Sequence, residues 1–160
     1  TVEYAAQKAY EKGVKVVLNP APACSLPESL FQHLYMITPN RIEAEMLTGV
    51  KINSKKDVAV AADVLYRKGV KNIIITLGGE GSFVREGEKT CYIDACKVVP
   101  VDTTAAGDTF NGAVCVGVSE GMSLEQAVLF ASKASSISVT RMGAQSSIPY
   151  RKELDINNLV

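Results

Sequence analysis

An acidic side chain follows a run of small residues in the segment Asp102–Gly112, which reads Asp-Thr-Thr-Ala-Ala-Gly-Asp-Thr-Phe-Asn-Gly. Small residues at Ala105, Ala106 and Gly107 allow backbone N–H groups to converge on an anion, and the apolar run that follows predicts a helix whose positive end faces it. Asp108 would then lie where an incoming hydroxyl loses its proton. The same residues also suit an ordinary helix cap with tight packing, so this segment alone leaves a phosphoryl-transfer site and a plain helix start equally open.

A second loop of small residues, Thr76-Leu-Gly-Gly-Glu-Gly81, comes directly after an apolar run with strand character. Gly78, Gly79 and Gly81 permit a close approach of backbone to a ligand, and Thr76 offers a hydroxyl. Two such loops at strand ends indicate a nucleotide, although Gly-Gly-Glu-Gly also suits an ordinary turn. The loop does not match Gly-x-x-x-x-Gly-Lys-Ser/Thr, which disfavours a P-loop enzyme.

A third polar segment, Thr38-Pro-Asn-Arg-Ile-Glu-Ala-Glu45, follows another apolar run and opens a predicted helix. Asn40 at the helix cap and Glu43 one turn inside it form the pattern of a capping box. At the carboxyl end of a parallel strand, the same two side chains also suit the orientation of phosphates or of waters on a magnesium ion. The sequence leaves both interpretations open.

The elements that must position these loops alternate between strands and helices. Apolar runs rich in β-branched residues predict strands over 14–18, 34–37 and 72–76, and helical patterns occupy about 1–12, 40–48 and 54–69. Near-continuous apolar strands indicate a sheet that is covered on both faces.

The remainder of the chain predicts an edge hairpin and two helices. Residues 82–85 and 90–94 read as strands around a turn at 86–89, and helices are expected over about 106–119 and 123–140. Ser123 and Gln126 form a second capping-box pattern at the last of these helices. The predicted fold class is therefore α/β, a three-layer α/β/α sandwich whose mostly parallel sheet has an edge hairpin.

Composition narrows the class of partner. The 160 residues suffice for one domain, residues 1–160, and 17 basic side chains balance 17 acidic ones without any basic cluster. We therefore expect a small-molecule partner, with no nucleic acid and no membrane surface. No apolar run reaches the roughly 20 residues that span a bilayer and no signal-type segment appears, so a cytoplasmic protein is predicted. The four cysteines lack metal-type spacing and are expected to be reduced thiols.

Taken together, the quoted motifs resemble those of a known family. The Asn40-x-x-Glu43 element, the Thr76–Gly81 loop, the Asp102–Gly112 segment and the tail Val139-Thr-Arg-Met-Gly-Ala-Gln-Ser-Ser-Ile-Pro149 occur here in the order found in the carboxyl-terminal half of ribokinases, within the PfkB carbohydrate kinases. The resemblance runs nearly end to end. Its most specific parts are the Asp102–Gly112 segment and the Gly-Ala-Gln tail.

The resemblance implies a role for each matching residue. It implies that Asp108 is the general base for the primary hydroxyl of a sugar and that Ala105, Ala106 and Gly107 form the anion hole for the transferred phosphoryl group. It implies an ATP site lined by Asn40, Thr76, Gly78, Gly79, Gly81 and Gly107, with Ser132 near the adenine and Glu43 helping to organise Mg²⁺ and phosphate. It also implies an activating potassium ion bound mostly by backbone carbonyls, surrounded by Asp102, Thr104, Ser138, Arg141, Gly143 and Ser147.

The reaction implied by the resemblance is the ATP-dependent conversion of D-ribose to ribose 5-phosphate. The amino-terminal half of that family, with its sugar-binding glycine motif and β lid, is missing from this chain, so we expect a fragment with little activity alone. A homodimer of the complete enzyme is expected as a possible assembly. Three alternatives stay open: a kinase for another sugar such as deoxyribose or fructose, a nucleotide-binding module without catalysis, and an α/β domain with a purely structural role.

Overall fold

The computed structural model describes residues 1–154, which form two compact units. Within the described residues, the first unit consists of residues 1–78 and 82–92, and the second consists of residues 79–81 and 93–154. The expectation that residues 1–160 form a single domain stays a prediction.

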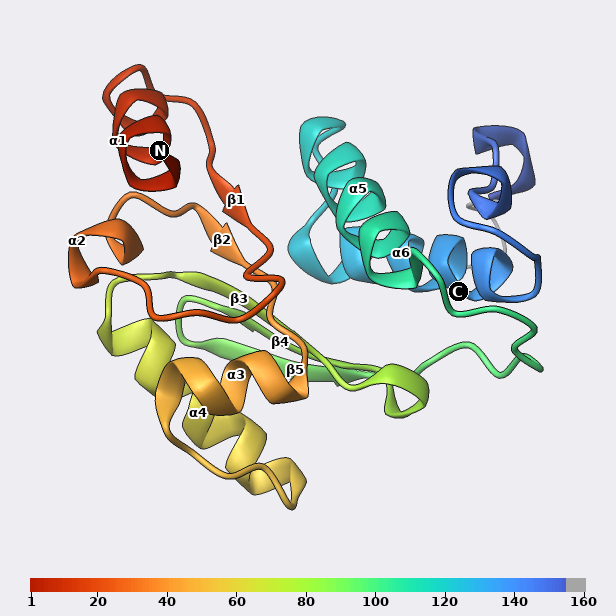
Figure 1. Cartoon of the computed structure of the whole chain (residues 1–160), viewed down its shortest axis with the longest axis horizontal. Helices are drawn as coiled ribbons and strands as arrows, with labels where there is room; N and C mark the ends of the chain where they lie inside the picture. Colours follow the sequence, from red (N-terminus) through yellow and green to blue (C-terminus); the bar gives the residue numbers. More distant parts are fainter. Residues whose placement is uncertain (155–160) are drawn as a thin grey trace. The chain divides into compact units, whose positions relative to one another are not determined.

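The helices and strands expected from the sequence are present, in the order shown in Figure 1. The first unit contains α1 (Val2–Glu11), β1 (Val17–Leu18), α2 (Glu28–Phe31), β2 (Met36–Ile37), α3 (Arg41–Thr48), α4 (Lys55–Arg67), β3 (Asn72–Thr76), β4 (Ser82–Glu86) and most of β5 (Lys89–Ile93). The second contains α5 (Ala106–Ser119), α6 (Leu124–Val139) and the 3₁₀ turns η2 (Gln145–Ser147) and η3 (Arg151–Glu153), and the turn η1 (Gly78–Glu80) spans the boundary.

The strands form one sheet in the order β1-β2-β3-β4-β5. β1, β2 and β3 run parallel, with Leu18 opposite Ile37 and Ile37 opposite Ile73. β4 pairs antiparallel with β3 and continues into β5 as a hairpin at the edge of the sheet. The predicted α/β class, with parallel strands and an edge hairpin, is confirmed. β1 and β2 are shorter than the apolar runs that predicted them, since the pairing between the two strands includes two residues of each.

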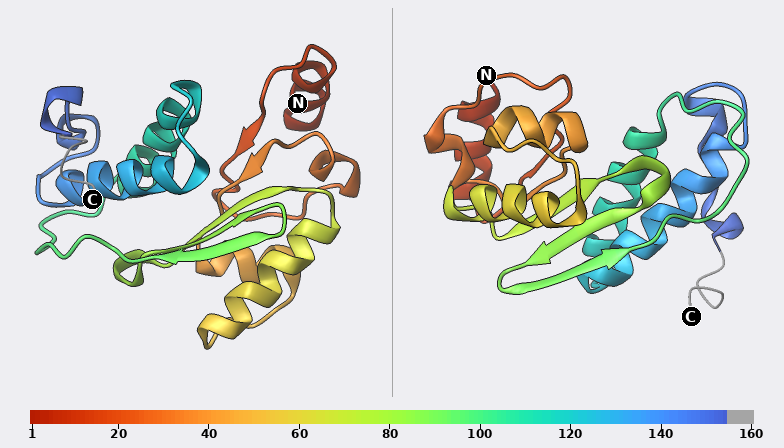
Figure 2. Two further views of the ribbon diagram at one scale, coloured as in Figure 1. Left: turned by 180° about the vertical axis from the view of Figure 1, so that it is seen from behind. Right: turned by 90° about the horizontal axis from the view of Figure 1, so that it is seen from below.

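Side chains of β3 alternate between the two faces of the sheet. Ile73 and Ile75 lie in a core cluster with residues of α3 and α4, which cover one face of the sheet in Figures 1 and 2. Ile74 lies between them in sequence, points to the opposite face and is also fully buried. The continuous apolar run is therefore explained by burial on both faces of this strand.

In the second unit α5 packs closely against α6. A Cβ added to Gly117 would lie 3.0 Å from the Cβ of Ala127, so these positions require small side chains. The Ser123–Gln126 capping box that begins α6 is confirmed. At the end of the described chain, Leu154 packs with Phe130 and Ala134 of α6.

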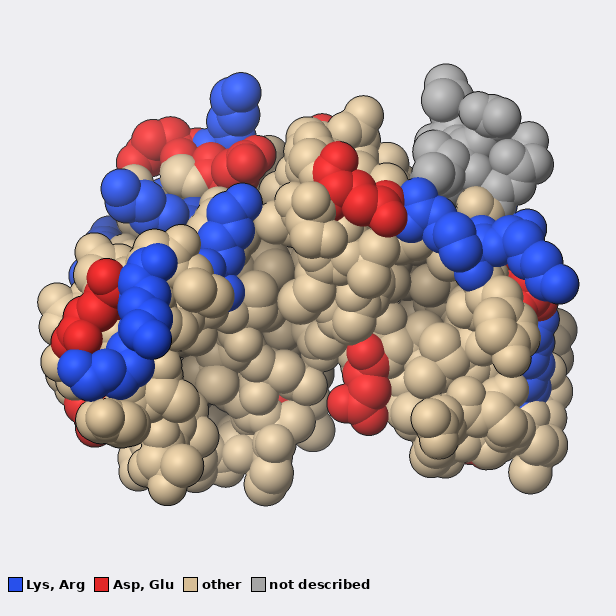
Figure 3. Space-filling model, turned by 90° about the horizontal axis from the view of Figure 1, so that it is seen from above, with Lys and Arg blue, Asp and Glu red and all other residues tan. Residues whose placement is uncertain are grey.

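The surface carries both signs of charge. On the face drawn in Figure 3, lysine and arginine side chains are interspersed with aspartate and glutamate. Cys24, Cys91, Cys96 and Cys115 form no disulfide with one another, and their reduced state stays a prediction. None of the helices in the described residues combines the length and apolar character needed to cross a membrane.

Candidate active site

The polar residues at the ends of β2 and β3 lie side by side in the first unit. Asn40, which follows β2, and Thr76, the last residue of β3, form an isolated parallel bridge, and the Thr76 amide donates to the Pro39 carbonyl at 3.0 Å. Asn40 is exposed, and Thr76 is half-buried. The parallel register therefore brings these two candidate nucleotide-binding residues together at one edge of the sheet.

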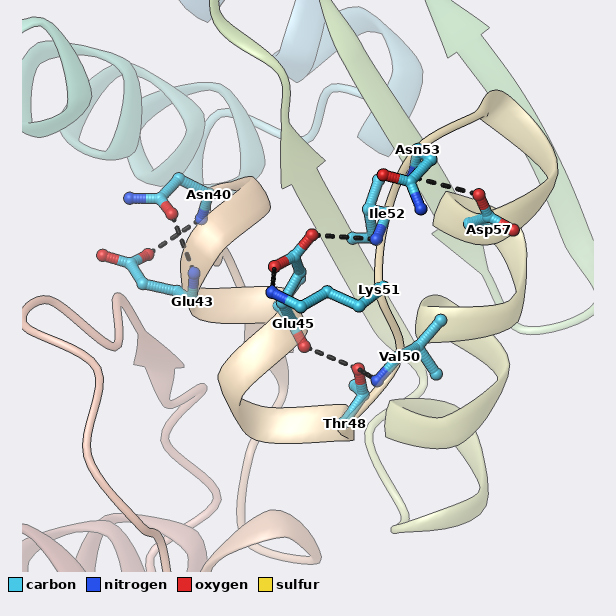
Figure 4. Close-up of polar contacts among 10 residues, drawn as sticks. Asn40, Glu43, Glu45, Thr48, Val50, Lys51, Ile52, Asn53 and Asp57 are labelled. Carbon is cyan, nitrogen blue, oxygen red and sulfur yellow. Dashed lines mark hydrogen bonds and ion pairs between the residues drawn. The ribbon is translucent and has the colours of Figure 1, made fainter.

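Asn40 and Glu43 form the capping box that their spacing predicts. The Asn40 side-chain oxygen accepts from the Glu43 amide at 2.9 Å, and a Glu43 carboxylate oxygen accepts from the Asn40 amide at 2.8 Å. Figure 4 shows the side-chain nitrogen of Asn40 and the second oxygen of Glu43 pointing to the same side. The capping role accounts for one polar atom of each side chain, and their role towards phosphate or magnesium stays a prediction.

The glycines after β3 differ in their backbone conformation and in the space around them. Gly78 has a positive φ of 60°, and a Cβ added to Gly78 or Gly79 would meet nothing within 4 Å. Gly81 has a φ of 94°, and its added Cβ would lie 2.0 Å from the carbonyl oxygen of Ile93. Close backbone packing therefore explains Gly81 without any ligand, whereas Gly79 keeps the open surroundings that a ligand contact needs.

We expect Gly81→Ala to destabilise the fold strongly. The methyl group would collide with backbone at Ile93 and Ala95, and the positive φ adds strain. Each effect costs about 1–3 kcal/mol. Chemical denaturation measures the loss, with Gly79→Ala as the matched control, since Gly79 has open space and no positive φ. Equal midpoints for the two variants would contradict this account of Gly81.

The loop that precedes α5 has an unusual backbone conformation. Ala105 is the helix N-cap with φ 59° and ψ 15°, and among the described residues it is the one non-glycine with a positive φ. A left-handed alanine costs roughly 1–2 kcal/mol, so surrounding contacts must hold it there. A left-handed residue directly before a helix turns successive N–H groups towards one side, which is the geometry of an anion-binding nest.

Backbone amides at the start of α5 are available to an anion. Within the described chain, the amides of Gly107 and Asp108 have no hydrogen-bond acceptor, and both residues are exposed. The Ala106 amide donates to the Thr103 carbonyl at 3.2 Å. The exposed Asp108 carboxylate likewise has no hydrogen-bond or ion-pair partner among the described side chains. A carboxylate and two free N–H groups at the positive end of a 14-residue helix fit a base beside an anion hole.

Three side chains hold the carbonyl groups of this loop. Thr109 Oγ1 donates to the Ala105 carbonyl at 2.9 Å, and Asn111 Nδ2 donates to the Gly107 carbonyl at 2.9 Å. Ser135 on α6 donates to the Ala106 carbonyl at 3.0 Å. None of these three side-chain contacts was expected from the sequence. Thr109 and Asn111 lie four positions after their acceptors, a detectable helical spacing, but Ser135 is 29 positions away and carries no local signal.

Residues expected around the potassium ion connect two loops within the second unit. Asp102 Oδ1 accepts from the Thr104 amide at 2.9 Å and from the Thr104 hydroxyl at 2.7 Å, while Oδ2 accepts from the Gly143 amide at 2.9 Å. The Val101 amide also donates to the Val139 carbonyl at 2.7 Å. Asp102 therefore links the loop before α5 to the loop after α6.

The remaining candidate residues lie on α6 or in the loop after it. Ser138 and Ser147 are buried, and their hydroxyls donate to the carbonyls of Ser135 and Ala144. The Arg141 side chain forms an ion pair with Glu153. Ser132 is half-buried on α6, in the second unit, whereas Asn40 and Thr76 belong to the first. Among the described side chains, no group of three or more His, Cys, Asp or Glu residues could hold a metal ion.

The contribution of Asp102 to stability should depend on pH. Hydrogen bonds from the Thr104 hydroxyl, the Thr104 amide and the Gly143 amide lower the pKa of Asp102 from its ordinary value of 3.8. Because the folded-state pKa lies below the unfolded one, the stabilisation is complete above about pH 4 and is lost as the pH falls through the folded value. We expect Asp102→Asn to lower the melting temperature equally at about pH 7 and pH 5, and by less near pH 3. A difference that stays constant down to pH 3 would contradict this role.

The fold agrees with comparisons to known proteins. The profile of the pfkB family of carbohydrate kinases matches residues 1–151, and the chain belongs to this family. It is 49% identical over 152 residues to a ribokinase of Haemophilus influenzae, covering 95% of this chain and 50% of that protein.

Solved structures show the same fold. A ribokinase from Thermotoga maritima is 40% identical, with a TM-score of 0.84, over 95% of this chain and 51% of that one. An Arabidopsis thaliana ribokinase, solved with ribose and ATP, is 32% identical, with a TM-score of 0.91, over 99% of this chain and 51% of that one. The ribokinase-like fold class is therefore confirmed, and the chain spans about half the length of the relatives that it matches.

Proposed function

We propose that this chain supplies the nucleotide-binding and catalytic residues of an enzyme that transfers the γ-phosphoryl group of ATP to the primary hydroxyl of ribose, giving ribose 5-phosphate. The observation that carries the proposal is the start of α5, where a left-handed Ala105 precedes two free amides and the exposed carboxylate of Asp108. Membership of the pfkB family and the similarity to ribokinases support this choice of reaction and sugar.

In the proposed reaction Asp108 accepts the proton of the sugar hydroxyl. The oxygen of that hydroxyl bonds to the γ-phosphorus of ATP as the bond between this phosphorus and ADP breaks. The amides of Gly107 and Asp108 donate to the oxygens of the transferred group, where negative charge gathers in the transition state. The positive end of α5 also attracts the anionic phosphoryl group. Positioning and electrostatics therefore supply most of the rate enhancement.

Cofactor residues are assigned by the same proposal. Asn40, Thr76, Gly78 and Gly79 contact ATP, and Glu43 orients magnesium or its waters; Gly81 keeps the loop in place through its packing on Ile93. Magnesium in kinases is commonly held by one or two carboxylates together with substrate phosphates, so the single carboxylate of Glu43 suits it.

Potassium suits the pair of loops joined by Asp102. The candidate ligands there are chiefly backbone carbonyls with one carboxylate, and carbonyl oxygens replace the hydration shell of potassium well. The remaining members of the proposed set are Thr104, Ser138, Arg141, Gly143 and Ser147.

Kinetics with a panel of sugars test the proposal. The full-length gene product, assayed for ADP release in potassium with magnesium and ATP, should show its highest kcat/KM with ribose, above 2-deoxyribose and fructose. A preference for either competitor would reassign the sugar while keeping the kinase. ATP binding by calorimetry without ADP release on any sugar would instead indicate a binding module.

A further inference from the structure

The carbonyl contacts at the start of α5 determine where its amides point. A peptide bond is planar and trans, so the C=O of one residue and the N–H of the next point in opposite directions. The Ala106 carbonyl and the Gly107 amide belong to one such unit. A hydrogen bond that holds the Ala106 carbonyl on one side of the loop therefore holds the Gly107 N–H on the other.

Ser135 supplies that hydrogen bond from a different helix. Its hydroxyl donates to the Ala106 carbonyl at 3.0 Å, across 29 positions of sequence, and Ser135 is half-buried where α5 and α6 pack together. Thr109 and Asn111 make equivalent bonds to the Ala105 and Gly107 carbonyls, but both belong to α5 and move with it. Ser135 is thus the contact that ties this amide to a second helix.

We propose that Ser135 is a positioning residue for phosphoryl transfer, which holds the Gly107 N–H in the direction of the transferred group. This inference rests on the proposed function and adds to it a residue on α6. The loop conformation supports it, because a left-handed alanine followed by unpaired amides is strained and needs external contacts to persist. Ser135 acts through the peptide unit and does not itself touch the substrates.

The test compares Ser135→Ala with Ser136→Ala in the full-length gene product. Ser136 is the next residue on α6, is also half-buried, and donates to the Lys133 carbonyl of its own helix at 2.8 Å. We expect Ser135→Ala to lower kcat roughly 3- to 10-fold, the range of one net hydrogen bond, with the KM for ATP unchanged. Ser136→Ala should retain the kcat of the unaltered protein, and Ser135→Thr, which keeps the hydroxyl, should recover most of the loss.

A binding measurement separates positioning from general loosening of the helix pair. ADP with aluminium fluoride and ribose mimics the charge of the transferring group, whereas ADP alone does not require the Gly107 amide. Ser135→Ala should weaken the aluminium fluoride complex by the same factor as kcat and leave ADP binding unchanged. Equal weakening of both ligands, or a kcat equal to that of Ser136→Ala, would overturn the proposal. An unaltered protein without sugar kinase activity would overturn the proposed function itself.

Discussion

Replacing Asp108 by Asn is expected to lower turnover on ribose by about 10²–10⁴-fold, the usual contribution of a general base, while ATP binding survives. Asparagine keeps the size and the position of the side chain but cannot accept the proton. Asp108 is exposed and its side chain makes no hydrogen bond within the described residues, so the substitution removes no side-chain contact of the folded chain. Steady-state kinetics measure the turnover, and calorimetry measures the affinity for ATP.

Asp94→Asn provides the control for this experiment, because Asp94 is also exposed in the second unit and lies outside the α5 loop. It should retain the kcat of the unaltered protein and the same melting temperature as Asp108→Asn. Turnover of Asp108→Asn within a factor of about three of the control would remove Asp108 from the role of base, since the smallest expected loss is about 10²-fold.

Gly107→Val is expected to depress turnover by about 10²–10³-fold, the usual loss when one donor of an anion hole is removed. A Cβ at Gly107 would meet nothing within 4 Å in the folded chain, so the side chain fits the protein alone. It would stand beside the free amides of Gly107 and Asp108 and keep a phosphoryl group from approaching them. The loss should appear in kcat rather than in protein stability.

Gly112→Val is the matched variant for this second prediction. Gly112 is exposed on the same helix and also has open space at its Cβ, so both variants introduce one β-branched residue into α5. Similar melting temperatures with a large difference in kcat would support the anion hole. Equal kcat values for Gly107→Val and Gly112→Val would mean that Gly107 does not contribute to an anion hole.

The architecture could be predicted because its signals are local. The apolar runs predicted β3 and its neighbouring strands. Both capping boxes, at Asn40 and Ser123, appear in the structure as their spacing indicates. The four-residue helix α2 was missed, since it is too short to show helical periodicity.

The site could be predicted less completely, because parts of it depend on contacts between distant residues. Alanine has no preference for the left-handed conformation of Ala105, and the hydrogen bond from Ser135 comes from 29 positions away. The close packing of Gly81 against the Ile93 backbone also joins segments that are apart in the sequence, whereas its role at a nucleotide stays a prediction. The hydrogen bond between Asp102 and the Gly143 amide spans 41 positions, so the sequence carries no local signal for it.

Identification of the reaction product tests the central claim most directly. The full-length gene product, incubated with ATP, magnesium, potassium and ribose, should form ADP and one phosphate monoester in equal amounts. Phosphorus–proton coupling in the NMR spectrum should place the ester on carbon 5 of ribose, and Asp108→Asn should abolish its formation on the same time scale. A phosphate on another carbon, or ADP accompanied by inorganic phosphate and unchanged ribose, would contradict the account.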